Sequence, residues 1–126
     1  SEEDKGSIMS ILATDLPVTS RQLKRILKRT GVGIARTGGY TGHGSGEVMI
    51  GFTTANRIPS GREEELLQLS AIPEHVINRA FLAAAEAEQE AILNSMTAAK
   101  QTRGREGELY YSLAEYLNDR EVETSK

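Results

Sequence analysis

Gly6 and Ser7 stand immediately before an apolar run, Ile8–Thr14, that has the composition of a buried strand. A serine hydroxyl is a weak nucleophile unless a base lies beside it, and a free α-amine with a pKa of roughly 7.7–8.0 can be that base. If the chain were cut between Gly6 and Ser7, Ser7 would carry both the nucleophile and the base. Gly6 has no Cβ, which would leave its carbonyl open to attack by the Ser7 hydroxyl. The same pair also fits an ordinary turn into a strand.

Ser45 and Glu47 are two residues apart, where a glycine-rich stretch, residues 38–46, meets an apolar segment. On an extended chain this spacing places both side chains on one face, so a hydroxyl and a carboxylate can form a short relay or position an ammonium group. The glycines do not form a P-loop, because no Gly-Lys-Ser/Thr follows, and they precede a strand rather than the helix of a dinucleotide site. A flexible hairpin tip with a solvated serine and glutamate is the alternative.

His43, beside Ser45, is another possible base, although a single histidine in a glycine loop is typical of a solvated side chain. The sequence has two His and no Cys, and no acidic residue pairs with a histidine at a ligand spacing, so we expect no metal and no cofactor. Glu86, Glu88 and Glu90 have a helical spacing that does not converge on a metal, and we interpret them as ion-pair or helix-packing groups.

The hydrophobic pattern and the chain breakers predict the elements that would position these residues. We expect strands at residues 8–14, 32–37 and 47–54, a helix at 20–30 with a Thr19–Gln22 capping box, a long helix at about 74–100 opened by Pro73, and a last helix at 108–118. The second and third strands are expected to form a hairpin, which gives the order β-α-β-β-α-α. Three strands beside a broadly apolar helix make an incomplete sheet, so we expect further strands from another segment or chain.

The chain has 126 residues, which fits one domain, and a formal net charge of −3. This acidic balance argues against nucleic acid as a partner. No apolar run reaches the ~18 residues of a membrane span, and no secretory signal pattern is visible. Together with the lack of cysteine, these features predict a cytoplasmic protein with neither a nucleic-acid nor a membrane partner.

Three stretches of the sequence occur in an order that resembles a known family. They are GSIMSILATDLPVTSRQLKRILKRTGVGIARTGG, GHGSGEVMIGFTTAN and EAEQEAILNSM, and the resemblance covers residues 6 to about 107. These stretches resemble the C-terminal catalytic chain of the L-aminopeptidase/D-esterase family, which includes the β-peptidyl aminopeptidases. The resemblance implies an α/β fold that is part of a four-layer α-β-β-α sandwich, similar to N-terminal-nucleophile hydrolases and completed by an N-terminal chain of the same precursor.

The resemblance also implies the chemistry. The precursor would cut itself between Gly6 and Ser7, leaving Ser7 as the N-terminal nucleophile, and Ser45 and Glu47 match the Ser-Gly-Glu motif that assists it. The product would be a serine aminopeptidase or amidase that releases N-terminal residues from short peptides, amides or esters, assembled as a homo-oligomer, often a tetramer. Residues 1–6 would be the precursor leader, 7–118 the catalytic chain and 119–126 a charged, disordered tail.

One departure from the processed form is that Ser1–Gly6 still precede Ser7, and an acylated Ser7 amine cannot act as a base. Two other functions remain open. The first is an acyltransferase of the ornithine acetyltransferase type, which has a similar architecture but threonine at the cut. The second is a noncatalytic interaction module whose contact surface is the basic segment 21–29.

Overall fold

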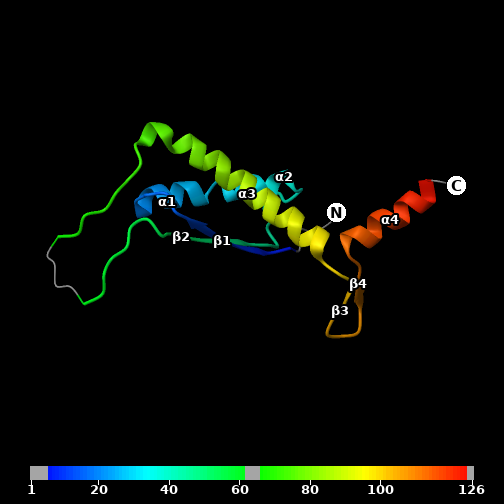
Figure 1. The fold of residues 1–126 in the computed structure, drawn as a ribbon. Helices are drawn as coiled ribbons and strands as arrows, with labels where there is room; N and C mark the ends of the chain where they lie inside the picture. The colour runs from blue at the N-terminus through cyan, green and yellow to red at the C-terminus, as the bar shows by residue number, and fades with distance from the viewer. Residues whose placement is uncertain (1–5, 62–65, 125–126) are drawn as a thin grey trace. The chain divides into compact units, whose positions relative to one another are not determined.

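The computed structural model describes residues 6–61 and 66–124, which form a mixed α/β fold (Figure 1). The chain divides into two compact units between Gln89 and Glu90, within its longest helix. The elements are β1 (Ile8–Thr14), α1 (Ser20–Leu27), α2 (Thr30–Arg36), β2 (Glu47–Thr53), the 3-10 helix η1 (Glu74–Val76), α3 (Ile77–Ala98), β3 (Thr102–Arg103), β4 (Leu109–Tyr110) and α4 (Leu113–Thr124).

The strands β1 and β2 pair in parallel, with Ile8 opposite Glu47 and Thr14 opposite Thr53. Parallel strands cannot be joined by a tight turn and need a crossover, which α1 and α2 provide in this chain. The expected hairpin between residues 32–37 and 47–54 is therefore wrong. The strands at 8–14 and 47–54 are confirmed, but they pair with each other.

Helix α1 begins as the sequence predicts, with a capping box at Thr19 and Gln22. The Gln22 backbone N–H donates to Thr19 Oγ1 at 3.1 Å, and the Thr19 N–H donates to Gln22 Oε1 at 3.1 Å. These two bonds satisfy backbone donors that the first turn of a helix leaves without partners. The helix ends at Leu27, three residues before the expected end, and a turn leads directly into α2.

Residues 32–37 were expected to form a strand, and this expectation is wrong because most of them belong to helix α2. Val32 and Ile34 are β-branched and favour strands, but packing outweighs this weak preference. Ile34 is buried, and a Cβ on Gly33 would lie only 2.5 Å from the carbonyl oxygen of Ala85 in α3. Gly33 thus lets the backbones of α2 and α3 touch, a contact that stabilises the helical conformation of this segment.

The helices of the first unit cover one face of the two-stranded sheet (Figure 1). The core of this unit consists of buried residues from the β1–α1 connection, α1 and α3, namely Val18, Ile26, Ile77, Ala80 and Ala84. The opposite face is equally apolar but open: Met9 and Ile11 of β1 lie beside Val48 and Ile50 of β2, and all four are at least half exposed. Within the described residues, no element covers this face.

The long helix expected at about 74–100 is confirmed. Pro73 precedes η1, and α3 follows directly and continues to Ala98. None of the described helices is long and apolar enough to cross a membrane. The last part of the chain differs from the expected helix at 108–118. Residues 102–110 form a short antiparallel hairpin, in which Gly107 has a φ of 87° that favours glycine.

Helix α4 starts at Leu113 because Ser112 caps it. The Ser112 Oγ and backbone N–H both donate to Glu115 Oε2, at 2.9 and 2.8 Å, and the Glu115 N–H donates to Ser112 Oγ at 3.2 Å. The helix continues to Thr124, past Asn118, where we expected a disordered tail to begin. The Ser-x-x-Glu spacing of this cap was visible in the sequence.

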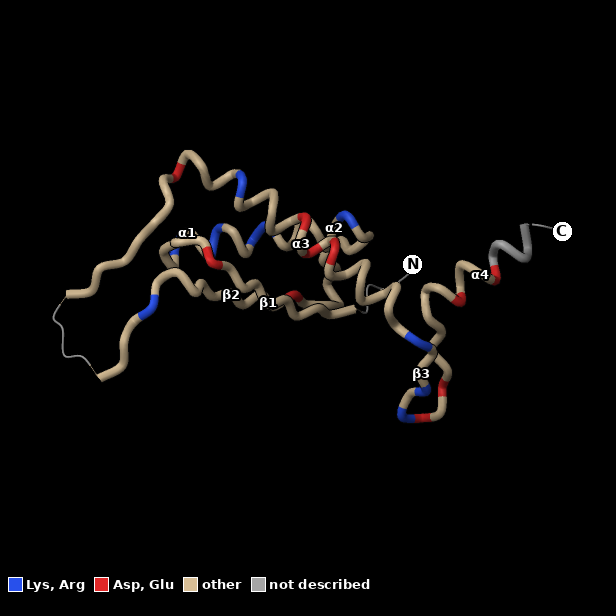
Figure 2. Tube along the Cα trace, viewed as in Figure 1, with Lys and Arg blue, Asp and Glu red and all other residues tan. Residues whose placement is uncertain are grey.

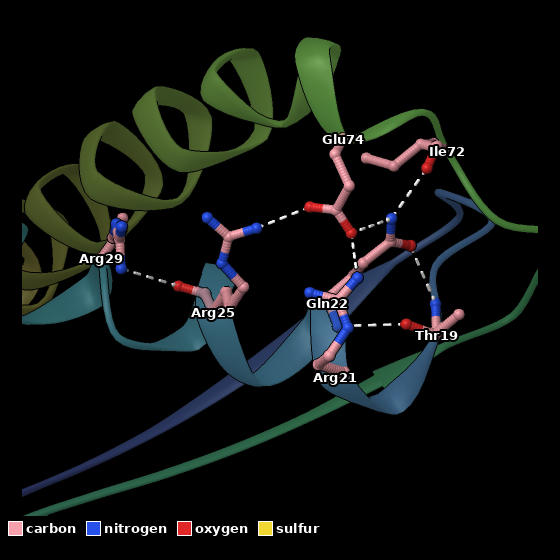
Figure 3. A network of polar contacts seen from close by, with 7 residues as sticks. All are labelled: Thr19, Arg21, Gln22, Arg25, Arg29, Ile72 and Glu74. Carbon is pink, nitrogen blue, oxygen red and sulfur yellow. Dashed lines mark hydrogen bonds and ion pairs between the residues drawn. The ribbon is translucent and has the colours of Figure 1, made fainter.

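A polar network ties α1 to the start of η1 (Figure 3). Glu74 forms ion pairs with Arg21 and Arg25, and it also accepts a hydrogen bond from Gln22 at 3.2 Å. Figure 2 shows Lys and Arg positions along α1 and α2, and Asp and Glu positions along α3. Arg25 and Arg29 also stack on the Phe81 ring, 5.3 and 3.9 Å from its centroid. Three of the basic side chains of segment 21–29 are thus engaged inside the unit.

We predict that Glu74→Gln weakens the fold in a pH-dependent way. The hydrogen bond from Arg21 holds the pKa of Glu74 below its ordinary value of 4.5. A carboxyl with a lowered folded-state pKa stabilises the fold above its unfolded pKa and loses this effect as the pH falls through its folded pKa. The variant should therefore show a small decrease in Tm at pH 7, and this decrease should shrink as the pH is lowered to 3.

The matched control is Glu86→Gln, which changes an exposed glutamate of α3. It should leave the Tm unchanged at both pH values. Equal Tm losses for Glu74→Gln at pH 7 and pH 3 would contradict an electrostatic role for Glu74.

Candidate active site

Ser7 lies beside Gly46, although the two residues are 39 positions apart in the sequence. The Gly46 N–H donates to Ser7 Oγ at 3.3 Å, and the Ile8 N–H donates to the Gly46 carbonyl at 3.1 Å. Both bonds follow from the parallel register, which sets Ile8 opposite Glu47 and so brings the residue before each of them together. The structure thus places the predicted nucleophile next to the middle residue of the Ser-Gly-Glu segment.

Ser45 is held in a turn, where its N–H donates to the Gly42 carbonyl at 3.2 Å. Its hydroxyl oxygen is buried, and within the described part of the chain it has no hydrogen-bond partner. An unpaired buried hydroxyl costs free energy, roughly 1–3 kcal/mol, so such groups are uncommon in folded proteins. The Ser45 hydroxyl is therefore available to a further hydrogen-bond partner.

Glu47 is the first residue of β2 and is half-buried. Its carboxylate makes no hydrogen bond or ion pair with the residues that the structure describes, and the Ser7 hydroxyl is not hydrogen-bonded to Ser45 or to Glu47 in that same part. The three predicted catalytic residues are therefore neighbours through the backbone of Gly46, and the structure of the described residues shows no hydrogen bond or ion pair between their side chains. In this arrangement Gly46 is the link between Ser7 and its own sequence neighbours Ser45 and Glu47.

Gly6, the residue before the expected cut, is exposed, and a Cβ built there would meet nothing within 4 Å. The peptide bond between Gly6 and Ser7 is therefore open to attack. His43 is exposed in the glycine-rich loop, which fits the solvated interpretation better than that of a base. No group of three or more His, Cys, Asp or Glu side chains among the described residues is arranged to hold a metal ion.

The sequence reasoning did not identify Gly46 as a functional residue. Its signal was present, because a glycine between a serine and a glutamate allows close approach to the backbone. In the structure a Cβ at Gly46 would meet nothing within 4 Å, and its N–H donates to Ser7 Oγ. What the sequence could not supply was the parallel register that brings Ser7 to this N–H.

The chain has clear relatives. A model of peptidase family S58 matches residues 1–110. The β-peptidyl aminopeptidase BapA of Sphingosinicella microcystinivorans is 35% identical over 102 residues, which cover 81% of this chain and 26% of that protein. The structure of the PH0078 protein from Pyrococcus horikoshii OT3 superposes with a TM-score of 0.77 at 44% identity, over 87% of this chain and 31% of the other.

A third relative is the L-aminopeptidase D-Ala-esterase/amidase of Ochrobactrum anthropi, described as a prototype of the serine aminopeptidases with a variant of the Ntn-hydrolase fold. It superposes with a TM-score of 0.75 at 35% identity, over 82% of this chain and 29% of the other. The mixed α/β fold is thus similar to that of the Ntn-hydrolase aminopeptidases. The chain belongs to peptidase family S58, which confirms the resemblance seen in the sequence. It spans between a quarter and a third of the length of these relatives.

We predict that Ser45→Ala does not weaken the uncut protein. The Ser45 hydroxyl has no partner among the described residues, so its removal deletes a desolvation penalty without breaking a hydrogen bond. Denaturant unfolding of protein with an intact Gly6–Ser7 bond should give a free energy equal to or above that of the wild type. The control is Ser10→Ala, which removes a buried hydroxyl that does donate a hydrogen bond and should cost about 1–3 kcal/mol. A loss for Ser45→Ala as large as for Ser10→Ala would show that Ser45 is already paired.

Proposed function

We propose that this chain is the catalytic chain of a self-processing serine aminopeptidase or amidase, with Ser7 as its N-terminal nucleophile. The observation that carries the proposal is the hydrogen bond from the Gly46 N–H to Ser7 Oγ. It holds the hydroxyl beside the Ser45-Gly46-Glu47 segment, where one hydroxyl has no partner among the described residues. Membership in peptidase family S58 and similarity to serine aminopeptidases support the same reaction class.

The first reaction would be self-cleavage. Ser7 Oγ attacks the carbonyl carbon of Gly6, and the C–N bond between Gly6 and Ser7 breaks, so that the acyl group moves from nitrogen to oxygen. The Ser7 nitrogen takes up a proton and becomes a free α-amine. Water then hydrolyses the ester, which leaves Gly6 with a carboxylate and Ser7 with both a hydroxyl and an amine. The exposure of Gly6 and the hydrogen bond that orients Ser7 Oγ both favour this attack.

The mature enzyme would use the amine that the cut releases. The α-amine of Ser7 accepts the hydroxyl proton as Ser7 Oγ attacks the substrate carbonyl, and it returns this proton to the leaving amine as the C–N bond breaks. The substrate acyl group is then an ester on Ser7, which water hydrolyses with the amine again as the base. An α-amine with an ordinary pKa near 8 is partly neutral at neutral pH, and this neutral form can accept a proton.

Ser45 and Glu47 would assist this base. The buried Ser45 hydroxyl can pair with the new α-amine and orient it, which would give this oxygen a partner. The Glu47 carboxylate, free of ion pairs among the described residues, can offset the positive charge that the amine gains in the transition state. Both roles require a cut chain, since an acylated nitrogen cannot accept a proton.

We also propose that this chain forms part of a four-layer α-β-β-α sandwich. The open face around Ile11 and Ile50 is apolar and about as wide as two strands, which is typical of a face that packs against a second sheet. An apolar groove of about 150 Å³ also runs between β1 and α3, lined by Leu12, Leu16 and alanines of α3. Both surfaces fit an N-terminal chain of the same precursor, which would supply the missing layers. The relatives are about three times as long as this chain, which leaves room for such a segment.

We further propose short peptides, amides or esters with a free N-terminus as substrates, and a homo-oligomeric enzyme, a tetramer by resemblance. The names of the relatives support this substrate class, since one is called a β-peptidyl aminopeptidase and another an L-aminopeptidase D-Ala-esterase/amidase. The acyltransferase alternative is not favoured, because Ser7 stands where that family has threonine. The interaction-module alternative is also weaker, since Arg21, Arg25 and Arg29 are engaged within the unit.

We predict that Ser7→Ala leaves the precursor uncut and without hydrolytic activity. Alanine has no hydroxyl, so neither the Gly6 carbonyl nor a substrate carbonyl can be attacked. Mass spectrometry of the full-length product reports the cut, and release of p-nitroaniline from an aminoacyl p-nitroanilide reports activity. A normal two-chain product from this variant would remove Ser7 from the mechanism. For the cut wild type, a rate that depends on an added acyl acceptor would instead indicate a transferase.

We predict that Glu47→Gln lowers kcat at least about tenfold, a barrier increase of ~1.4 kcal/mol, with little change in Tm. A preorganised group at developing charge is typically worth about 10²–10³ in rate. The substitution keeps the shape and removes the charge, and Glu47 makes no contact within the described residues whose loss would weaken the fold. Turnover must be measured on material shown by mass spectrometry to be cut before Ser7.

The matched control for Glu47→Gln is again Glu86→Gln, which should retain the wild-type kcat. If Ser45 and Glu47 act on the same amine, the losses from Ser45→Ala and Glu47→Gln should combine less than additively. A fully cut Glu47→Gln enzyme with the wild-type kcat would show that Glu47 is only a solvated residue of the loop.

A further inference from the structure

A buried hydrogen bond joins strand β1 to helix α3 close to the candidate active site. Ser10 Oγ donates to Glu88 Oε1 at 2.6 Å, between residues that are 78 positions apart. Ser10 is only 8% exposed, and Glu88 is half-buried. The helix-facing neighbours of Ser10 along β1 are Ile8 and Leu12, so this polar pair lies in otherwise apolar surroundings.

Glu88 is fixed from a second side by helix α2. A Cβ on Gly33 would lie 2.7 Å from the Cβ of Glu88 and 2.9 Å from the backbone nitrogen of Gln89. The stem of Glu88 therefore touches the bare backbone of α2, while its carboxylate receives the Ser10 hydroxyl. A single side chain thus contacts β1, which begins directly after Ser7, and α2, which leads through the glycine-rich loop to Ser45 and Gly46.

A hydrogen bond between β1 and α3 can fix the position of the helix along the strand more sharply than apolar contacts do. Contacts between alkyl groups depend weakly on direction, so a helix can slide over an apolar strand at little cost. A hydroxyl–carboxylate bond is short and directional, and it fixes the position of one partner along the other. In some proteins buried polar groups specify register, so such a pair can contribute to geometry in addition to stability.

We propose that Ser10 and Glu88 are positioning residues for the reaction, which hold β1 and α2 so that Ser7 Oγ stays aligned with Gly46 and Ser45. The inference rests on the proposed function. Neither residue touches the reacting atoms, because Ser10 is three residues from Ser7, a distance of about 10 Å along a strand. A misplacement of only about 1 Å in an active site can cost roughly 10²-fold in rate, so a distant contact of this kind can control turnover.

The test compares Ser10→Thr with Ser10→Val, two substitutions that are isosteric with each other, in the complete self-processed enzyme. Threonine and valine have nearly the same shape, but only threonine can donate to Glu88. With an aminoacyl p-nitroanilide as the substrate, Ser10→Thr should retain the wild-type kcat. Ser10→Val should lower kcat at least about tenfold per cut chain while KM stays within about twofold, because substrate binding is intact and only the alignment of the nucleophile is lost.

A second pair acts on the other partner. Glu88→Gln keeps an oxygen that accepts from Ser10 and should retain kcat, whereas Glu88→Leu should lower kcat as Ser10→Val does. The double variant Ser10→Val, Glu88→Leu should be no slower than either single variant, since all three break one bond. Glu86→Leu, at an exposed position of the same helix, controls for the loss of a glutamate and should have no effect.

Equal kcat values for Ser10→Val and Ser10→Thr, or for Glu88→Leu and Glu88→Gln, would overturn the positioning role. Failure of both apolar variants to give soluble protein would also overturn it, because the pair would then serve stability alone. Soluble protein that stays uncut would support it, because self-cleavage also needs an aligned Ser7. The Ser7→Ala precursor separates this outcome from failure of the proposed function. If that variant is inactive while the Ser10 pair shows no difference, only the positioning role fails, whereas an active Ser7→Ala variant would remove the proposed function itself.

Discussion

The parallel pairing of β1 with β2 is the interaction on which the rest of the candidate site depends. Two backbone hydrogen bonds mark its ends, from the Ile8 N–H to the Gly46 carbonyl at 3.1 Å and from the Thr54 N–H to the Thr14 carbonyl at 2.9 Å. A slip of one residue would exchange the two faces of a strand, exposing the side chains that pack under the helices. It would also move Ser7 away from the Gly46 N–H. Register therefore determines both the core of the first unit and the surroundings of Ser7.

This register is maintained by the crossover that joins the two strands. A Cβ on Gly51 of β2 would lie 3.0 Å from the Leu27 side chain, so α1 sits close to the sheet where the strand has no side chain. The far end of Met49 lies 3.8 Å from the Cβ position of Gly31, at the start of α2. Small residues thus let two short helices lie low over two strands. In the same way, Gly33 has no side chain, so α3 can pack closely against α2. This close packing brings Glu88 to Ser10.

The features of the fold that could be predicted from the sequence are local. The capping box of α1 needs only Thr19 and Gln22, and the apolar runs of β1 and β2 show which segments are extended. Helix α2 could not be predicted in this way, because Val32 and Ile34 favour strands and the packing of Gly33 against α3 decides the outcome. The strand pairing failed for a related reason. A glycine-rich connection suggests a hairpin, but residues 32–36 are helical, and β2 pairs instead with β1, the other described strand of the first unit.

The candidate site likewise combines features that short sequence motifs indicate with contacts between residues far apart in the sequence. The residue types of Ser7, Ser45 and Glu47 suggested a possible chemistry beside ordinary alternatives, and the resemblance of three ordered stretches to a known family assigned their expected roles. The Gly46 donor and the Ser10–Glu88 bond join residues 39 and 78 positions apart, and no local pattern indicates which distant residue will be the partner. Such contacts follow only from the complete topology, even though each involves common residue types.

The unpaired hydroxyl of Ser45 connects this topology to the order of events in the proposed reaction. Burying a hydroxyl without a partner lowers the stability of a fold by roughly 1–3 kcal/mol unless another group forms a hydrogen bond with it. While Gly6 is attached, the Ser7 nitrogen is an amide with no lone pair to act as a base and no charge to attract the hydroxyl or the Glu47 carboxylate. The cut converts this nitrogen into an amine that can meet both needs. On this mechanism the uncut chain is already folded around the position of its future base, so self-cleavage changes the chemistry of one nitrogen atom rather than the fold, and the hydrogen bond from Gly46 holds the nucleophile in place throughout.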